Sequence, residues 1–388
     1  MKARISKDKS VEAIGLDIVH VPVMFDEVMK AMDGKKGEIF IDCTFGGGGH
    51  TRGLLERGCT VVAIDRDVQA GRYAEALASK GYPIWFYNRV FSQLGHIHQQ
   101  WMWEYVNSTV KVGRGIVEIG EAGNDERIEL GRAAEREDYS EYFEEKAQLI
   151  ESMIANGRIK QPQIAGILAD FGICTHQLYN KRGFSFKHND PLDMRMGRSK
   201  IKASDILRQY SEEALADLFF FLSDEKQSRL IARKIVALRA KKPITHMYDL
   251  LQLFPEQHSS MHPATKVLQA LRIEVNQELK EIHQLLEAAH CLKQEKSFKL
   301  ACISFHSGED RIVKNMFSSW VKENNNIGKN DPKDIKYENI SNERFEQYSN
   351  RCKLLTKKPI EPTEEEIRRN PASRSAKLRV CELSGSSD

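Results

Sequence analysis

Short apolar runs alternate with amphipathic segments along two parts of this chain. The runs have the length of β-strands and cover residues 39–44, 60–65, 84–87, 164–170 and 299–305. Segments with helical spacing of apolar residues follow the first two runs, at 51–57 and 68–79. Strands that alternate with helices predict an α/β fold with a doubly wound, mostly parallel sheet. In such folds the ligand binds at the carboxyl ends of the strands.

Two longer segments interrupt this alternation. Residues 104–160 are acidic and weakly periodic, and predict a solvated insertion with partial helix near 139–154. Residues 201–268 have apolar positions at helical spacing and predict an inserted all-helical domain, and one long helix is expected at 264–289. We therefore expect an α/β domain in two parts with the helical domain between them, at 1–200, 201–268 and 269–388.

A run of glycines, Gly46 to Gly49, lies between the first strand and the helix that follows it. Asp65 ends the second predicted strand. A glycine turn lets the backbone approach a ligand, and an acid at the end of the next strand accepts hydrogen bonds from a ribose. The glycines lack the spaced G-x-G-x-x-G register, so NAD is the weaker candidate. S-adenosylmethionine, which has a ribose but no phosphate, is favoured.

Charge is divided unevenly along the chain. The net charge is +3, but residues 104–160 hold 13 acidic and 8 basic residues, so the remainder carries about +8. A positive remainder favours a nucleic-acid partner. The seven cysteines are scattered without a C-x-x-C pair, which indicates reduced thiols and no metal site. No apolar run approaches the ~18 residues of a membrane span. We expect a cytoplasmic protein or, because the insertion is unusual, one of an organelle matrix.

A series of motifs in fixed order resembles one known family, the bacterial small-subunit ribosomal RNA (cytosine-N4)-methyltransferases of the H or MraW type. The motifs are HVPVM at 20–24, CTFGGGGH at 43–50, AIDRD at 63–67, RGFSF at 182–186, PLDMRM at 191–196, HPATK at 262–266, QALRIEVN at 269–276, ISFHS at 303–307, EDRIVK at 309–314, and NP at 370–371 with RSAKLR at 374–379.

The resemblance implies a class I methyltransferase fold with an inserted helical domain. It also implies methyl transfer from S-adenosylmethionine to the exocyclic N4 amine of a cytidine in the decoding region of small-subunit ribosomal RNA. The substrate would be this RNA or the pre-ribosomal small subunit, with no membrane involved, and a homodimer is compatible with the family. By position, the family's cofactor contacts fall on Gly48, Gly49, His50, Asp65, Phe91, Asp170 and Gln177.

Two departures from the family pattern lie beside the expected reaction centre. Residues 170–178 read DFGICTHQL where the family usually reads DLGVSSPQL, and Gly308 replaces a usual leucine. Asp170 and Gln177 are retained despite these changes. The departures motivate a competing hypothesis, a non-catalytic RNA-binding ribosome-assembly factor on a methyltransferase fold. A methyltransferase for proteins or small molecules is disfavoured by the motifs and by the basic remainder.

Asp170 ends the fourth predicted strand and is the first candidate catalytic residue. A cytosine amine is a poor nucleophile because its lone pair is delocalised into the ring. A carboxylate that accepts its N–H groups would localise that pair and receive the departing proton. Asp170 could instead only orient the cofactor. The two hypotheses differ in whether its loss reduces turnover more than cofactor affinity.

Two further segments supply weaker candidates. The loop at 182–196 contains aromatic residues and arginines, and could cover a flipped-out or single-stranded base, with Asp193 contacting the cytosine amine. The same aromatics could equally anchor the helical domain. His306, after the fifth strand, is a candidate for substrate contact, although a lone histidine is more often structural. Basic stretches at 233–234, 239–242, 353–358 and 368–379 are candidate phosphate contacts.

Overall fold

The computed structural model of the chain describes residues 21–110, 148–149, 152–173, 181–197, 199–254, 262–321 and 352–385. Most of the expected acidic insertion lies outside the described residues. Its beginning was placed too early, because residues 104–110 continue the helix α4 (Leu94–Val110). Among the described helices, none combines the length and the apolar character needed to cross a membrane.

Seven strands form one sheet in the order β3-β2-β1-β4-β5-β7-β6. The five strands expected from the sequence are parallel: β1 (Ile39–Asp42), β2 (Thr60–Asp65), β3 (Ile84–Asn88), β4 (Ile164–Asp170) and β5 (Phe298–Ser304). The chain order reverses between β1 and β4, where an open α/β sheet forms its ligand crevice. This confirms the doubly wound, mostly parallel sheet.

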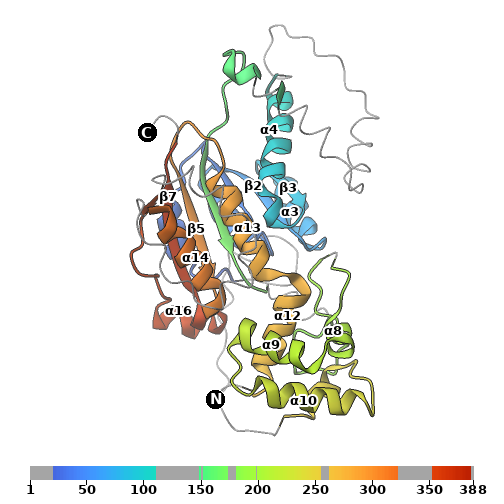
Figure 1. The fold of residues 1–388 in the computed structure, drawn as a ribbon. Helices are drawn as coiled ribbons and strands as arrows, with labels where there is room; N and C mark the ends of the chain where they lie inside the picture. Colours follow the sequence, from blue (N-terminus) through green and yellow to red (C-terminus); the bar gives the residue numbers. More distant parts are fainter. Residues whose placement is uncertain are drawn as a thin grey trace, which may run out of the picture.

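Helices cover both faces of the sheet (Figure 1). One face packs against α4, α13 (Glu278–His290) and α14 (Ser307–Val321), and the other against α1 (Phe25–Met32), α2 (Gly49–Glu56) and α3 (Ala70–Ala78). Within β1, Ile41 belongs to the first core and Phe40 to the second. Strands buried on both faces read as continuous apolar runs, which is why the sequence identified them.

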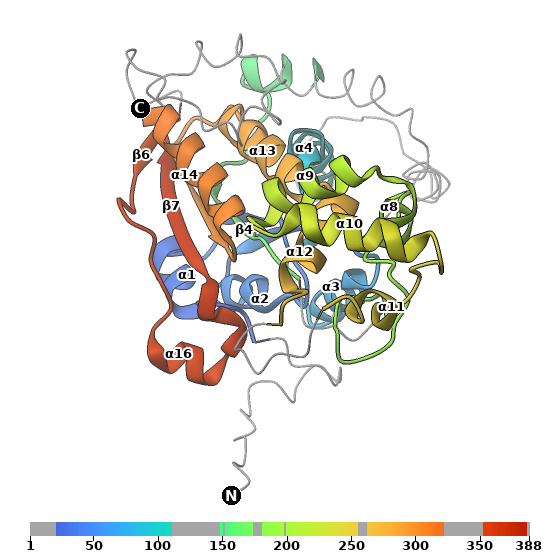
Figure 2. The same ribbon diagram turned by 60° about the horizontal axis from the view of Figure 1, so that its bottom comes forward.

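The inserted helices gather beyond the edge of the sheet toward which β4 points (Figures 1 and 2). They are α8 (Ala203–Gln209), α9 (Glu212–Ser223), α10 (Ser228–Arg239) and α11 (Met247–Leu251). Helix α12 (Thr265–Asn276) packs against α9 and returns the chain to the sheet. The expected single helix over 264–289 is wrong, because Gln277 has a left-handed backbone (φ 51°) that separates α12 from α13. We call this break the elbow.

The sequence did not predict the last two strands. Strand β7 (Lys377–Leu383) runs antiparallel between β5 and β6 (Cys352–Leu354). Arg379 in β7 is only 8 % exposed, and its guanidinium contacts both carboxylate oxygens of Asp310 at 2.7 and 3.1 Å. The interpretation of Arg379 as a phosphate contact is therefore wrong. The ion pair fastens β7 to the first turn of α14. Helices α16 (Glu364–Arg369) and η3 (Pro371–Ser375) precede β7.

Candidate active site

The glycine turn and Asp65 are held together at the carboxyl ends of β1 and β2. The Asp65 carboxylate accepts one backbone N–H from Gly46 at 2.7 Å and one from Asp67 at 2.7 Å. Gly48 caps α2 with a left-handed backbone (φ 74°), and a Cβ there would lie 2.8 Å from the Phe45 ring. The turn therefore requires glycine at this position. Gly49 begins α2 directly behind it.

Asp42 ends β1 beneath the glycine turn and is almost fully buried. Its carboxylate accepts a hydrogen bond from the Thr51 hydroxyl at 2.6 Å and another from the Thr44 backbone N–H at 3.1 Å. Burial raises the pKa of Asp42 to about 6, against the opposing effect of these two hydrogen bonds. With a pKa of about 6, Asp42 can gain or lose its proton near neutral pH, and a positive charge bound next to it would favour the carboxylate form.

Asp170 ends β4, next to β1 across the switch point of the sheet. Its backbone N–H donates to the Thr44 hydroxyl at 2.6 Å, which ties it to the glycine turn. Within the described part of the chain, its buried Oδ1 has no hydrogen-bond partner. Burial, and then the nearby carboxylates of Asp42 and Glu309, raise the pKa of Asp170 to about 8. A buried acid held in this way at a strand end is typical of a functional site.

His50 lies inside the first turn of α2 and faces Asp170. Its Nε2 is 3.0 Å from the backbone carbonyl of Val23, which only accepts, so Nε2 carries the ring proton. The other nitrogen, Nδ1, lies 3.8 Å from Oδ2 of Asp170. The contact with Val23 brings the segment before α1 against the site. His50 therefore has a structural contact on one side and the acidic cluster on the other.

Phe91 begins the turn η1 (Phe91–Gln93) after β3, on the same edge of the sheet as Asp65. The Arg66 guanidinium lies over its ring at 5.6 Å, and the Phe171 ring is 5.9 Å from it. Asn88 donates to the Asp65 carbonyl at 2.9 Å and so joins the ends of β2 and β3. Phe91 therefore lies at the same end of the sheet as Asp65, and its contact with the cofactor stays a prediction.

The loop at 181–197 is pinned to the same edge, and we call it the lid. Arg182 donates to the Asp67 carboxylate at 2.8 Å and to the Arg195 carbonyl at 2.9 Å. Asp193 is engaged by Arg195 through two side-chain hydrogen bonds of 2.7 and 2.8 Å. Burial opposes ionisation of Asp193, but the Arg195 hydrogen bonds and charge lower its pKa. Asp193 holds the lid in shape, and its contact with a substrate amine stays a prediction.

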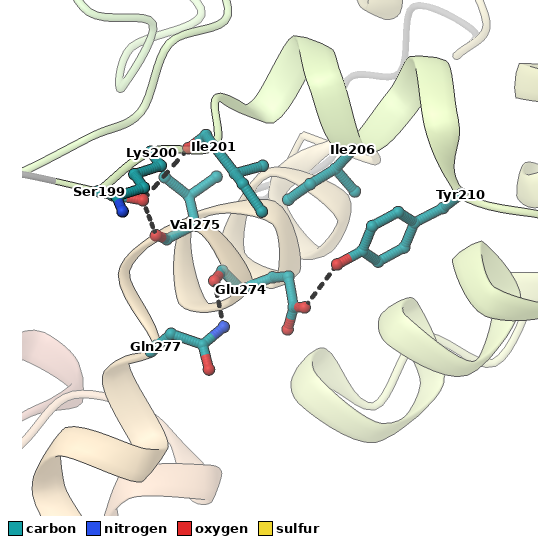
Figure 3. A pocket seen from close by; sticks show the side chains of 8 residues that line it. All are labelled: Ser199, Lys200, Ile201, Ile206, Tyr210, Glu274, Val275 and Gln277. Atoms are coloured by element: carbon teal, nitrogen blue, oxygen red, sulfur yellow. Dashed lines mark hydrogen bonds between the residues drawn. The ribbon is translucent and has the colours of Figure 1, made fainter.

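The elbow meets the lid and β2 through Asn276. The Asn276 side chain accepts from the Met196 N–H and donates to the Met194 carbonyl, both at 2.8 Å. The backbone carbonyl of Asn276 accepts from Arg66 at 3.0 Å. A cavity of about 210 Å³ lies beside this junction, between the 199–201 loop, α8 and the end of α12 (Figure 3). None of the expected cofactor contacts lines it.

His306 caps the start of α14. Its Nδ1 accepts the backbone N–H of Gly308 at 3.2 Å, and its Nε2 lies 3.1 Å from Oε1 of Glu309. Glu309 accepts the Phe305 N–H at 2.7 Å. Burial opposes ionisation of Glu309, but the neighbouring His306 and Arg272 outweigh it and lower its pKa. Arg272 also pairs with Glu278, so these charges form one connected network.

The same network contains the metal-like cluster of the described residues, in which ligand atoms of Glu278, His306 and Glu309 lie within 4.8 Å of one another. Arg272 already neutralises Glu278 by hydrogen bonds of 2.9 to 3.2 Å. His306 uses Nδ1 as a helix cap, which leaves the proton on Nε2, toward Glu309. Glu278 is thus neutralised by Arg272, and the positive charge of this arginine opposes binding of a cation at the cluster.

The structure therefore brings six of the expected cofactor contacts to one edge of the sheet: Gly48, Gly49, His50, Asp65, Phe91 and Asp170. The seventh, Gln177, lies outside the described residues, as do Cys174 and His176. Sequence reasoning missed the roles of Arg66, Arg182 and Glu309. The acids and arginines packed into 63–67 and 182–195 were the available signal, because charges that flank a buried strand end need partners.

The model of the MraW methylase family matches residues 17–384 of this chain. The chain belongs to the MraW methylase family. The similar curated proteins are ribosomal RNA small subunit methyltransferases H. The one from Sulfurihydrogenibium sp. is 33% identical, with 94% of this chain and 98% of that protein covered. The one from Beijerinckia indica is 35% identical, with 96% and 87% covered. The one from Neorickettsia sennetsu is 31% identical, with 94% and 96% covered.

Several of the motifs that this chain shares with the family form contacts around the glycine turn, the lid and the elbow. The motif at 43–50 forms the turn that binds Asp65, and the motif at 63–67 supplies Asp65 itself, one contact with the elbow and one with the lid. The motif at 269–276 ends on Asn276 at the elbow. Gly308, where a leucine is usual, donates its N–H to His306, and a Cβ there would lie 3.1 Å from that ring. The departure therefore gives the His306 ring more room.

Proposed function

We propose that this MraW methylase transfers a methyl group from S-adenosylmethionine to the N4 amine of a cytidine in the decoding region of small-subunit ribosomal RNA. The family and the names of the relatives support methylation of this RNA. The observation that carries the chemistry is Asp170, a buried acid at the switch point of the sheet whose Oδ1 has no hydrogen-bond partner among the described residues.

The residues present fit S-adenosylmethionine. Each Asp65 oxygen accepts one backbone hydrogen bond, which leaves lone pairs that can accept the ribose hydroxyls. The amides of the glycine turn suit the carboxylate of the methionine end, and the acid Asp42 below the turn suits its ammonium. Phe91 can contact the adenine. When bound, S-adenosylmethionine supplies an electrophilic methyl group on a positively charged sulfur.

Asp170 has the position and the protonation behaviour needed for the amine. A positive charge beside an acid lowers its pKa, so a cationic cofactor favours the carboxylate form of Asp170 over the protonated form. The carboxylate then accepts an N–H of the cytosine amine, which localises the nitrogen lone pair toward the methyl group. The proton released from nitrogen passes to Asp170.

The test uses small ribosomal subunits that lack N4-methylcytidine, incubated with the protein and methyl-labelled S-adenosylmethionine. Digestion to nucleosides and mass spectrometry should find labelled N4-methylcytidine. Asp170→Ala should reduce turnover far more than the affinity for S-adenosylmethionine. Equal losses would make Asp170 a cofactor-orienting residue.

Three other results would overturn the proposal. Tight RNA binding without label would support the non-catalytic assembly factor, and label in another nucleoside or in protein would assign a different substrate. The pre-ribosomal particle as substrate, a homodimer and a cytoplasmic or organellar location stay predictions. Comparing free RNA with assembled subunits in the same assay tests whether the particle rather than the free RNA is the substrate.

A further inference from the structure

Helix α10 and the residues on either side of it carry several positive charges with no negative charge among them. Residues 226–242 contain seven lysines and arginines and no acidic residue. Six of these side chains are exposed, and we call them the basic face: Lys226, Arg229, Arg233, Lys234, Lys241 and Lys242. The seventh, Arg239, is turned inward and donates to the Leu207 carbonyl at 2.7 Å. The opposite side of the helix, with Ile231 and Ile235, is buried in the core.

Few acids compensate the basic face. Arg233 lies 3.5 Å from Glu212, and Lys242 lies 2.6 Å from Asp249. For the other four cations, the described parts of the chain provide no ion-pair partner. Like charges on one helix face repel, because residues three and four positions apart are neighbours. A helix that only covered the core would be more stable with acids among these positions, so the uncompensated charge points to an anionic partner.

The basic face leads into the lid. After Lys242 the chain pairs with the lid through the Thr245 carbonyl, which accepts the Leu192 N–H at 2.9 Å, and through the Met247 N–H, which donates to the Asp190 carbonyl at 2.9 Å. Two aromatic side chains are exposed at this junction. Phe186 in the lid is 40 % exposed and stacks on His262 at 5.3 Å, and Tyr248 in α11 is 52 % exposed.

We propose that the basic face of α10, continued by Phe186 and Tyr248, is a track for the single-stranded RNA that flanks the target nucleotide. This inference rests on the proposed function. Cations that follow a backbone, together with aromatic rings that stack bases, are the pattern of single-strand binding. A membrane-surface helix would place its apolar side in the lipid, but that side of α10 is buried in protein. The track delivers the strand to the lid from outside the cofactor crevice.

The test compares two variants with the same change in net charge. The track variant carries Lys226→Gln, Arg229→Gln, Lys234→Gln and Lys241→Gln. The control variant carries Lys35→Gln, Lys36→Gln, Lys293→Gln and Lys296→Gln, all exposed and placed before β1 or β5, at the opposite edge of the sheet. Affinity for a fluorescent single-stranded RNA of the target sequence is measured at a series of salt concentrations.

Each phosphate contact in a single strand contributes roughly 0.7 to the slope of log affinity against log salt concentration. The track variant should therefore lose about 3 from this slope, and the control variant should keep the wild-type slope. Equal slopes in the two variants would overturn the track, because net charge alone would then explain the binding. Phe186→Leu should weaken single-stranded RNA binding about ten-fold and leave duplex binding unchanged. Equal losses for both RNA forms would refute the stacking role.

The failure of the track and of the proposed function can be told apart. Methylation of small subunits by the wild-type protein is measured separately. If the wild type methylates them, but the track variant keeps the wild-type salt slope of RNA affinity, only the track is refuted and the proposed function stands. Binding to vesicles of phosphatidylserine gives a further outcome. If the track variant loses vesicle binding and keeps RNA binding, the basic face serves a lipid surface and the inference is wrong.

Discussion

Replacing Asp170 by asparagine should stabilise the protein at pH 8 while it removes activity. The Asp170 carboxyl is buried at the end of β4, its Oδ1 is unpaired among the described residues, and its pKa is raised from 3.8 to about 8. Between these two values the native state holds a proton that the unfolded chain releases. The contribution of Asp170 to the free energy of unfolding is therefore largest below pH 4 and falls as the pH rises toward 8.

The size of the effect follows from this linkage. One extra bound proton in the native state changes the free energy of unfolding by about 1.4 kcal/mol per pH unit. Between pH 5 and pH 8 the wild type should lose about 4 kcal/mol that Asp170→Asn does not lose. The neutral amide has no proton to release, although its own buried polar atoms cost about 1–3 kcal/mol at every pH. The difference between the variants must therefore grow with pH.

Urea unfolding of both proteins at half-unit steps from pH 5 to pH 8 tests this expectation. Contributions of other groups, such as the buried His98 with its pKa lowered to about 4, cancel in the difference. Asp193→Asn is the matched control, because the pKa of Asp193 is lowered and its titration is complete below this range. Parallel curves for the wild type and Asp170→Asn would refute the reasoning, since Asp170 would then be ionised throughout.

Three further predictions concern the lid, the cap and the last strand. Gly183 has a φ of 78°, and a Cβ there would lie 2.5 Å from the Pro191 carbonyl oxygen, so Gly183→Ala should raise the RNA KM without changing affinity for S-adenosylmethionine, measured by calorimetry. His306→Asn should keep stability and turnover because asparagine also caps helices, whereas His306→Ala should cost about 1 kcal/mol in unfolding. A hundred-fold loss of turnover in a stable His306→Asn would instead make His306 catalytic. Arg379→Met should cost about 3 kcal/mol, because the buried Asp310 then loses both guanidinium hydrogen bonds and keeps only the longer contact with Lys377 at 3.7 Å. Adding Asp310→Asn should recover most of that loss, and no recovery would contradict the ion-pair explanation.

The sequence predicted the central strands because they are buried on both faces. Residues 60–65 and 164–170 were predicted as strands with the observed bounds. The break at Gln277 escaped prediction because apolar spacing continues through it on both sides. A left-handed non-glycine residue has no reliable signal in a single sequence, since its strain is compensated by tertiary contacts such as those of Asn276.

Strand β7 escaped prediction for a different reason. Its charged residues Lys377, Arg379 and Glu382 interrupt the apolar pattern, and only the fold reveals that Asp310 neutralises Arg379. The site shows the same limit. The glycine turn and Asp65 could be predicted because they follow one another closely in the sequence. The approach of His50 and Glu309 to Asp170 could not, because these residues come from three separate elements that meet only in the folded chain.

The position of β7 has a consequence for synthesis of the chain on the ribosome. Strand β5 pairs with β4 on one side and with β7 on the other, and β7 is made more than 70 residues after β5. Until residues 377–383 emerge, β5 presents an unpaired edge open to pairing with other chains. The part of the sheet formed by β5, β7 and β6, which ends at Ser304 next to His306, is therefore completed late. During that interval, pairing of β5 with another chain would compete with its native pairing to β7.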